Sequence, residues 1–271
     1  MSRLKLILLI SLTGICLGTF AQNAQRIVSL APSLTNMLYL LDAGDRMVGC
    51  TSYCTEAVQD NKEIVASAVE VNVEKVLLLK PDWVVATTIT KPTVIESMRK
   101  MGLNVLVLSS PKSYNDICTQ LLTLAKPVGK EFMAQNIITK QQERLNALAK
   151  KIPSGQKPRV FFEIGAQPLF TVIPNTFMDD FITFAGGENI ASDLTRGTIT
   201  RENVLLKNPD VIVVVTMGIV GDEEKTTWEG YSNLSAAKTG KIFIVDSDKA
   251  CSPNPVTFVD VVEELINLIY K

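Results

Sequence analysis

Histidine is absent from the 271 residues of this chain. Without an imidazole, the chain cannot carry a Ser-His-Asp or Cys-His catalytic system, a zinc site with histidine ligands or a haem iron held by histidine. This absence favours a protein that binds its target over an enzyme that hydrolyses it.

Excess charge and long apolar runs are also scarce. Lys and Arg number 27 and Asp and Glu 28, for a formal net charge of −1, so nothing in the composition attracts nucleic acid. Beyond the N-terminus, no apolar run approaches the roughly 20 residues that cross a bilayer. The hydrophobic content of 46% is nevertheless ample for a buried core, and the length suffices for two lobes.

The first residues are typical of a secretory signal peptide over residues 1–21. A basic start, a largely apolar run over 6–17 and a small-x-small cleavage site at 19–21 fit that pattern. The apolar run is too short for a membrane anchor. Ile15 stands where a lipoprotein signal has a small residue before Cys16. We therefore expect simple cleavage and a periplasmic protein.

Cysteine is sparse in the chain that would remain after cleavage. Its four cysteines are Cys50, Cys54, Cys118 and Cys251. Cys50 and Cys54 are close enough in sequence for a disulfide if the loop between them bends, and free buried thiols fit the pattern as well. The usual zinc spacings are missing, so we expect no metal site.

One stretch occurs twice. Residues 72–86 align without a gap with residues 200–214, at a constant offset of 128 that matches Glu74 with Glu202 and one Pro-Asp pair with the other. A repeat of this kind predicts a duplicated structural unit.

Each copy of the unit predicts a helix, a turn and a strand. Asn72 and Thr200 are good N-cap residues, and Glu74 and Glu202 place a carboxylate in the first helical turn, where the helix dipole favours it. A valine and two leucines follow in each helix, and we expect them in the core. Proline then ends the helix, and a β-branched run predicts a strand buried on both faces.

Strands alternate with helices along the chain, which favours parallel sheets covered by helices. Residues 128–151 differ, because they form one long helical pattern midway between the two copies. We interpret this stretch as a helix that links an N-terminal lobe, residues 22–127, to a C-terminal lobe, residues 152–271. A single stiff connector should limit hinge motion between the lobes.

Several motifs, taken with both copies of the unit, resemble those of a known family. They are residues 26–33 (RIVSLAPS), 48–53 (VGCTSY) and 181–189 (FITFAGGEN). They resemble periplasmic substrate-binding proteins of ABC importers, of the class with a single linking helix that carries cobalamin, haem or ferric siderophores. The resemblance implies an α/β protein of two Rossmann-like lobes, with parallel sheets joined by one long helix. It also implies that the protein is not an enzyme and has no resident cofactor.

The resemblance places the ligand in a cleft between the lobes, at the loops that follow the strands. Tyr53 has a counterpart in the cobalamin-binding branch, where a tyrosine of the equivalent loop contacts the ligand. The tryptophans that flank the cobalamin ring in that branch would fall near Ala68 and Thr87, and this chain has none there. The candidate ligand-binding residues are Ser33, Tyr53, Thr87, Ser110, Glu163, Gln167, Phe170, Trp228, Asp246 and Asp248.

The chemistry of this set favours cobalamin or a related corrinoid, because its carboxylates and amide could hydrogen-bond the amide-rich edge of the ring. Haem is an alternative, with Tyr53 as an oxygen ligand of the iron. An anionic ferric siderophore, which prefers arginines, is another. A chelatase or a thiol-redox enzyme using Cys50 and Cys54 is a weaker hypothesis, because histidine is absent and the C-x3-C spacing is not that of redox motifs.

The resemblance also gives Glu74 and Glu202 a role, namely docking onto arginines of a membrane permease dimer. A simpler interpretation is that both are first-turn carboxylates, worth about 0.3–1 kcal/mol each. Both copies kept Glu while the neighbouring Lys75 and Asn203 diverged, which favours docking. We expect a monomer that delivers a small molecule to this permease.

Overall fold

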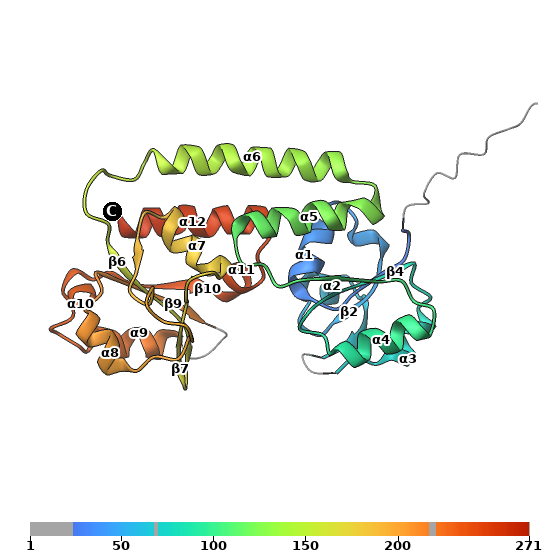
Figure 1. Cartoon of the computed structure of the whole chain (residues 1–271), viewed down its shortest axis with the longest axis horizontal. Coiled ribbons are helices and arrows are strands. Elements are labelled where there is room, and N and C mark those ends of the chain that lie inside the picture. Colours follow the sequence, from blue (N-terminus) through green and yellow to red (C-terminus); the bar gives the residue numbers. More distant parts are fainter. Residues whose placement is uncertain (1–23, 68–69, 217–220, 271) are drawn as a thin grey trace, which may run out of the picture.

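The computed structural model describes residues 24–67, 70–216 and 221–270, so the predicted signal peptide lies outside the described residues. Two α/β lobes stand side by side beneath a shared layer of helices (Figure 1). The N-terminal lobe is blue to green and the C-terminal lobe is yellow to red.

The N-terminal lobe is built on a five-stranded sheet with the order β3-β2-β1-β4-β5, and its strands are all parallel. The order reverses direction between β1 and β4. The strands are β1 (Ile27–Ser29), β2 (Met47–Thr51), β3 (Glu63–Ala66), β4 (Trp83–Thr87) and β5 (Val105–Leu108). The helices are α1 (Pro32–Leu40), η1 (Gly44–Arg46, a 3-10 turn), α2 (Thr55–Gln59), α3 (Val73–Leu78) and α4 (Pro92–Lys100).

The C-terminal lobe repeats this plan with one difference. Its sheet has the order β10-β9-β6-β7, with β8 beside β6. Strand β7 returns antiparallel to β6, whereas the other pairs are parallel. The strands are β6 (Arg159–Ala166), β7 (Leu169–Thr171), β8 (Glu188–Asn189), β9 (Val211–Thr216) and β10 (Ile242–Asp246). The helices are α7 (Phe177–Phe184), α8 (Arg201–Lys207), α9 (Gly221–Glu229), α10 (Ser235–Thr239), α11 (Ser247–Cys251) and α12 (Pro255–Ile269).

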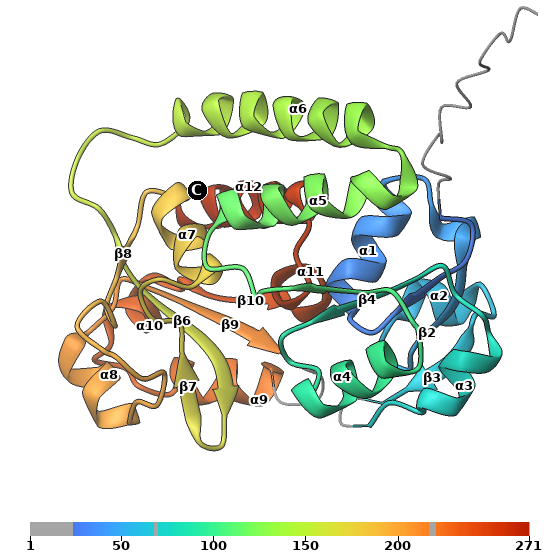
Figure 2. The same ribbon diagram turned by 45° about the vertical axis from the view of Figure 1, so that its right-hand side comes forward.

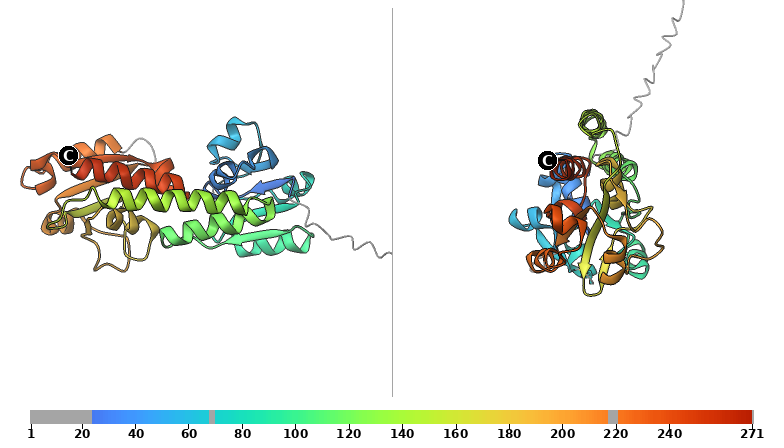
Figure 3. Two further views of the ribbon diagram at one scale, coloured as in Figure 1. Left: turned by 90° about the horizontal axis from the view of Figure 1, so that it is seen from above. Right: turned by 90° about the vertical axis from the view of Figure 1, so that its left-hand side faces the viewer.

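Two long helices connect the lobes in sequence, α5 (Tyr114–Val128) and α6 (Glu131–Ala149). Helix α6 runs across both lobes, as Figures 1 and 3 show. It begins at Glu131 rather than at residue 128, because Gly129 adopts a left-handed conformation with φ 66° and ends α5. Arg144 of α6 pairs with Asp260 and Glu263 of α12 at 2.8 and 2.7 Å.

A single hydrophobic cluster extends through both lobes. It includes Met37 of α1 on one side and Phe162 of β6 on the other. Tyr114, at the start of α5, joins the two sides, since its ring lies 4.7 Å from that of Phe258 and its backbone N–H donates to Asp180. Because the lobes share a close-packed interior, a wide hinge opening would expose part of it to water.

The two helix starts of the duplicated unit are capped as predicted. The Asn72 side chain accepts a hydrogen bond from the backbone N–H of Lys75 at 2.9 Å. The Thr200 hydroxyl accepts from the N–H of Asn203 at 3.3 Å. Both copies therefore begin their helix in the same way.

The aspartate of each Pro-Asp pair joins two neighbouring strands where they start. The Asp82 carboxylate accepts hydrogen bonds from the backbone N–H groups of Gln25 and Arg26 at 2.7 and 2.9 Å. The Asp210 carboxylate accepts from the N–H of Arg159 at 2.9 Å. In return, the carbonyls of Arg26 and Arg159 accept from the aspartate N–H groups, both at 2.8 Å. The pair thus fastens β4 to β1 and β9 to β6.

The apolar side chains of the unit are only partly in the core. Val76 and Val204 are fully buried as expected, but Leu78 and Leu206 are 80% and 83% exposed. The prediction that both leucines are core residues is wrong, because each lies at the outward side of a helix of less than two turns.

We expect Asp82→Ala to destabilise the protein by about 1–2 kcal/mol, since two backbone N–H groups at a strand start lose a charged acceptor. Urea unfolding followed by circular dichroism measures the change. Asp82→Asn keeps an acceptor oxygen and serves as the matched control, with a smaller loss. Equal losses for the two variants would show that the hydrogen bonds are not the cause.

Candidate functional site

A cavity between the lobes has a volume of about 1080 Å³. We call it the main cleft. Strands β1 to β4 each end beside it, and α11 closes it from the C-terminal lobe. Its lining residues are Leu30, Ala31, Pro32, Thr51, Tyr53, Ala66, Ser67, Glu70, Val71, Thr87, Ile89, Thr90, Lys91, Val94, Ser247, Asp248, Cys251 and Ser252.

The position of the main cleft follows from the strand order. The order in which the chain adds strands to the sheet changes direction between β1 and β4. The loops after these two strands therefore diverge and leave a crevice at their carboxyl ends. The segment after β1 supplies Leu30 to Pro32, and the end of β4 supplies Thr87 and the loop to Lys91. Ligands of open α/β sheets bind at such reversal points.

The walls of the main cleft are largely apolar and carry few charges. Ile89 and Tyr53 are 78% and 61% exposed, so a ligand that covered them would remove apolar surface from water. The charged groups of the described lining are Glu70, Lys91 and Asp248. This composition suits a large ligand with an apolar face and polar edges.

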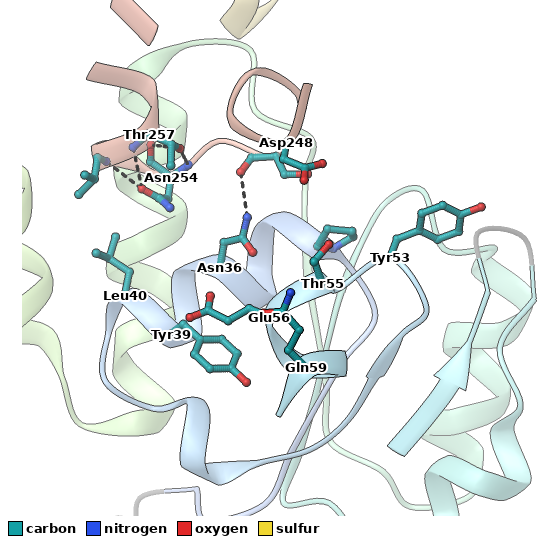
Figure 4. A pocket seen from close by; sticks show the side chains of 13 residues that line it. Asn36, Tyr39, Leu40, Tyr53, Thr55, Glu56, Gln59, Asp248, Asn254 and Thr257 are labelled. Atoms are coloured by element: carbon teal, nitrogen blue, oxygen red, sulfur yellow. Dashed lines mark hydrogen bonds between the residues drawn. The ribbon is translucent and has the colours of Figure 1, made fainter. Parts of the chain in front are cut away.

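A smaller cavity, of about 510 Å³, lies between α1 and α2 on one side and α11 and α12 on the other (Figure 4). Asn36 of α1 reaches across it and donates to the Ser252 carbonyl at 3.4 Å. Burial, with a smaller contribution from Asp60, raises the pKa of Glu56 in its wall. Helix sides rather than strand ends form this cavity, so we take the main cleft as the ligand site. Tyr53 lines both cavities.

Three predicted residues, Tyr53, Thr87 and Asp248, line the main cleft. Asp246 precedes the lining residue Ser247 but does not line the cleft itself. Its carboxylate accepts hydrogen bonds from the N–H groups of Asp248 and Lys249 and so caps α11. The other exposed or half-buried candidates also lie outside the described lining. They are Ser33, Ser110, Gln167 and Phe170.

Ser33 lies in the first turn of α1. The helix begins at Pro32 with Ala31 as the N-cap residue, because proline suits the first helical position, where no N–H is needed. Ser33 therefore lies inside the helix and does not cap it.

The structure corrects the prediction for Glu163 and Trp228, which are both buried inside the C-terminal lobe. The indole Nε1–H of Trp228 donates to Glu163 Oε2 at 2.6 Å. The Arg201 guanidinium lies 4.8 Å from the centre of the Trp228 ring and pairs with Glu224. The Trp228 indole and one Glu163 oxygen thus pair within the core, whereas Glu163 Oε1 and Arg201 Nη1 are buried without a hydrogen-bond partner among the described residues. Neither Glu163 nor Trp228 belongs to the described lining of the main cleft.

The Cys50–Cys54 disulfide is also absent, since both residues are buried free thiols. A hydrogen bond from Cys50 lowers the pKa of Cys54 to about 6, with further donors in Thr35 and Thr51. The same bond, aided by burial, raises the pKa of Cys50. Two sulfur atoms that share a hydrogen bond are much farther apart than the roughly 2.05 Å of a disulfide bond.

Sequence reasoning missed most of the apolar lining of the main cleft. Ile89 is the clearest omission, and the signal was a lone branched apolar residue within the polar loop from Thr87 to Lys91.

Among the described residues, no group of three or more metal-binding side chains could hold an ion, and no helix is long and apolar enough to span a bilayer.

Comparison with known proteins identifies the family. A sequence model of the family described as periplasmic binding protein matches residues 27–249. The chain belongs to the periplasmic binding protein family. The resemblance found in its sequence motifs is thereby confirmed.

Three relatives illustrate the match. An uncharacterised ABC transporter substrate-binding lipoprotein, YvrC of Bacillus subtilis, is 29% identical over 93% of this chain and 82% of its own. A vitamin B12-binding protein of Yersinia pseudotuberculosis is 32% identical over 78% of this chain and 75% of its own. The crystal structure of the vitamin B12-binding protein BtuF of Vibrio cholerae superposes with a TM-score of 0.76 at 26% identity, covering 91% of this chain and 97% of that one.

Membership of the family settles the broad function. The chain is a non-enzymatic, extracytoplasmic substrate-binding protein of an ABC transporter, with a permease as its partner and a small molecule as its ligand. The chelatase and thiol-redox hypotheses are accordingly set aside. The two-lobed α/β fold predicted from the sequence is confirmed as well.

The buried Glu163 predicts an unusual dependence of stability on pH. Burial raises its pKa from 4.5 to about 7, and the nearby Glu224 adds to the shift. Between these values the unfolded chain releases a proton that the folded chain keeps, so stability falls as pH rises through this range. Glu163→Gln stays neutral and should be more stable than wild type at pH 8, by about 1–3 kcal/mol, with a smaller difference at pH 5.

Thermal unfolding at the two pH values measures this effect. Glu143→Gln, on the exposed side of α6, is the matched control and should behave as wild type at both. A difference between Glu163→Gln and wild type that did not change with pH would contradict the assignment.

Proposed function

We propose that this protein binds cobalamin or a related corrinoid in the main cleft and delivers it to the permease. The observation that carries the proposal is a cleft of about 1080 Å³, above the roughly 300–1,000 Å³ of most small-molecule pockets. Its exposed Ile89 and Tyr53 offer apolar area to a large flat ring. The vitamin B12-binding relatives support this choice.

The charges of the main cleft favour a corrinoid over an anionic ligand. Two carboxylates, Glu70 and Asp248, and one ammonium, Lys91, belong to its described lining. Carboxylates accept hydrogen bonds from the amide groups at a corrinoid edge. They repel an anionic ferric siderophore, and a single lysine can neutralise only one of the two propionates of haem.

We further propose that Glu74 and Glu202 dock onto arginines of a permease dimer, as carboxylate–guanidinium pairs are directional and would fix the orientation. Both side chains are exposed. Hydrogen bonds from its own backbone N–H and from the Thr200 hydroxyl lower the pKa of Glu202 and keep it ionised.

We also propose that the protein acts as a periplasmic monomer after removal of residues 1–21. The relative YvrC is described as a lipoprotein, so the mature N-terminus is the point to check. Mass spectrometry of the exported protein should find a chain that starts at Gln22. A lipid-modified Cys16 would contradict simple cleavage.

Titration with cyanocobalamin, haemin and ferric siderophores tests the ligand assignment. We expect stoichiometric cobalamin binding that Tyr53→Phe preserves and Tyr53→Ala weakens about tenfold, because only the second variant removes the ring, worth roughly 0.5–1.5 kcal/mol beyond its buried area. Phe132→Ala, which removes another exposed aromatic ring on α6, is the control. Haemin binding that Tyr53→Phe abolishes would instead identify Tyr53 as an iron ligand and overturn the corrinoid proposal.

Charge reversal tests the docking role. Glu74→Lys with Glu202→Lys should abolish stimulation of the transporter ATPase while ligand affinity stays unchanged. The control is Glu131→Lys with Glu143→Lys on α6, because Glu131 is also a first-turn carboxylate. Stimulation that survives in the first variant, or is lost equally in the control, would show that the two glutamates do not dock.

A further inference from the structure

Leu78 and Leu206 are large apolar side chains of the duplicated unit that lie in water, with exposed fractions of 80% and 83%. They occupy equivalent positions, at the same offset of 128 that relates the two copies. Their neighbours Val76 and Val204 are fully buried. The same pattern of one buried and one outward apolar residue thus occurs in both lobes.

Each leucine shares a helix face with the proposed docking glutamate. Leu78 follows Glu74 by four positions, and Leu206 follows Glu202 by four, a spacing that places side chains one above the other. Helices α3 and α8 lie towards the same lower edge of the molecule, one in each lobe (Figures 1 and 2). We call these two pairs, Glu74 with Leu78 and Glu202 with Leu206, the docking patches.

The N-terminal docking patch adjoins the main cleft. Glu70 and Val71 belong to the lining of the cleft, and the next residue, Asn72, caps α3. A partner that covers this patch would therefore stand beside the opening through which ligand enters or leaves.

Isolated exposed leucines are common and need no explanation. Here, however, an exposed leucine recurs at the matching position of a second helix, although other outward positions changed between the copies, as Lys75 and Asn203 did. Neither leucine contributes much buried area to its own lobe. A contact made outside the chain accounts for both.

We propose that Leu78 and Leu206 insert into apolar surface of the permease beside the basic groups that receive Glu74 and Glu202. The inference rests on the docking role proposed above and adds a second chemistry to it. The partner would offer two equivalent sites, each a basic group next to an apolar depression. The glutamates steer and orient the encounter, while the leucines stabilise the complex by leaving water.

The experiment measures binding of the full-length mature protein to the permease complex of its transporter in lipid nanodiscs. Leu78→Ser and Leu206→Ser should each weaken binding about tenfold, which corresponds to about 1.4 kcal/mol, and the double variant should weaken it further. Conservative replacement by Met at both positions should restore binding. Phe132→Ser, on the opposite edge at α6 and 81% exposed, is the matched control and should bind as wild type.

Salt separates the two contributions, because exposed charges are screened at about 0.5 M salt and apolar contacts are not. The effect of the serine variants should therefore persist at high salt, with ligand affinity and melting temperature unchanged. Serine variants that bind as wild type, while charge reversal at Glu74 and Glu202 abolishes binding, would overturn the role of the leucines and leave the docking glutamates standing. If neither set of variants altered binding, both proposals would be wrong.

Discussion

The hydrogen bonds of Asp82 and Asp210 at the strand starts are the constraint on which the geometry of both lobes depends. They set β1 against β4 and β6 against β9, the two central pairs. In the N-terminal lobe, the opposite ends of the same pair carry the first residues of the main cleft. A slip of one residue in this pairing would turn every side chain of the strand to the other face of the sheet. The geometry of the main cleft thus depends on contacts made at the opposite ends of its strands.

The duplicated unit separates framework from specificity. Both copies retain the helix cap, the strand-joining aspartate, the first-turn glutamate and the outward leucine. The cleft, in contrast, is lined by loops outside the repeated framework, such as the segment around Ile89. This division explains why the framework residues of a single sequence identify the family, whereas the ligand is inferred from the shape and charge of one cavity.

The sequence predicts the parts of the structure that local chemistry decides. The caps at Asn72 and Thr200, the alternation of strands and helices and the long linking helix all follow from residues close in sequence. The burial of Glu163 does not, because the indole that donates to one of its oxygens comes from α9, far along the chain. The sequence does not predict that Leu78 points outward either, because a helix of six residues is too short for its apolar periodicity to show which face is buried.

Rigidity connects the core to the docking patches. The hydrophobic cluster shared by the lobes and the pairs between Arg144 and α12 hold the lobes together, so we expect the two patches to keep a nearly constant separation. A partner with two matching sites then gains from both contacts while ordering little of this protein, which raises the effective concentration at the second site. It follows that the same shared interior that restricts hinge motion favours recognition by a partner built of two equivalent halves.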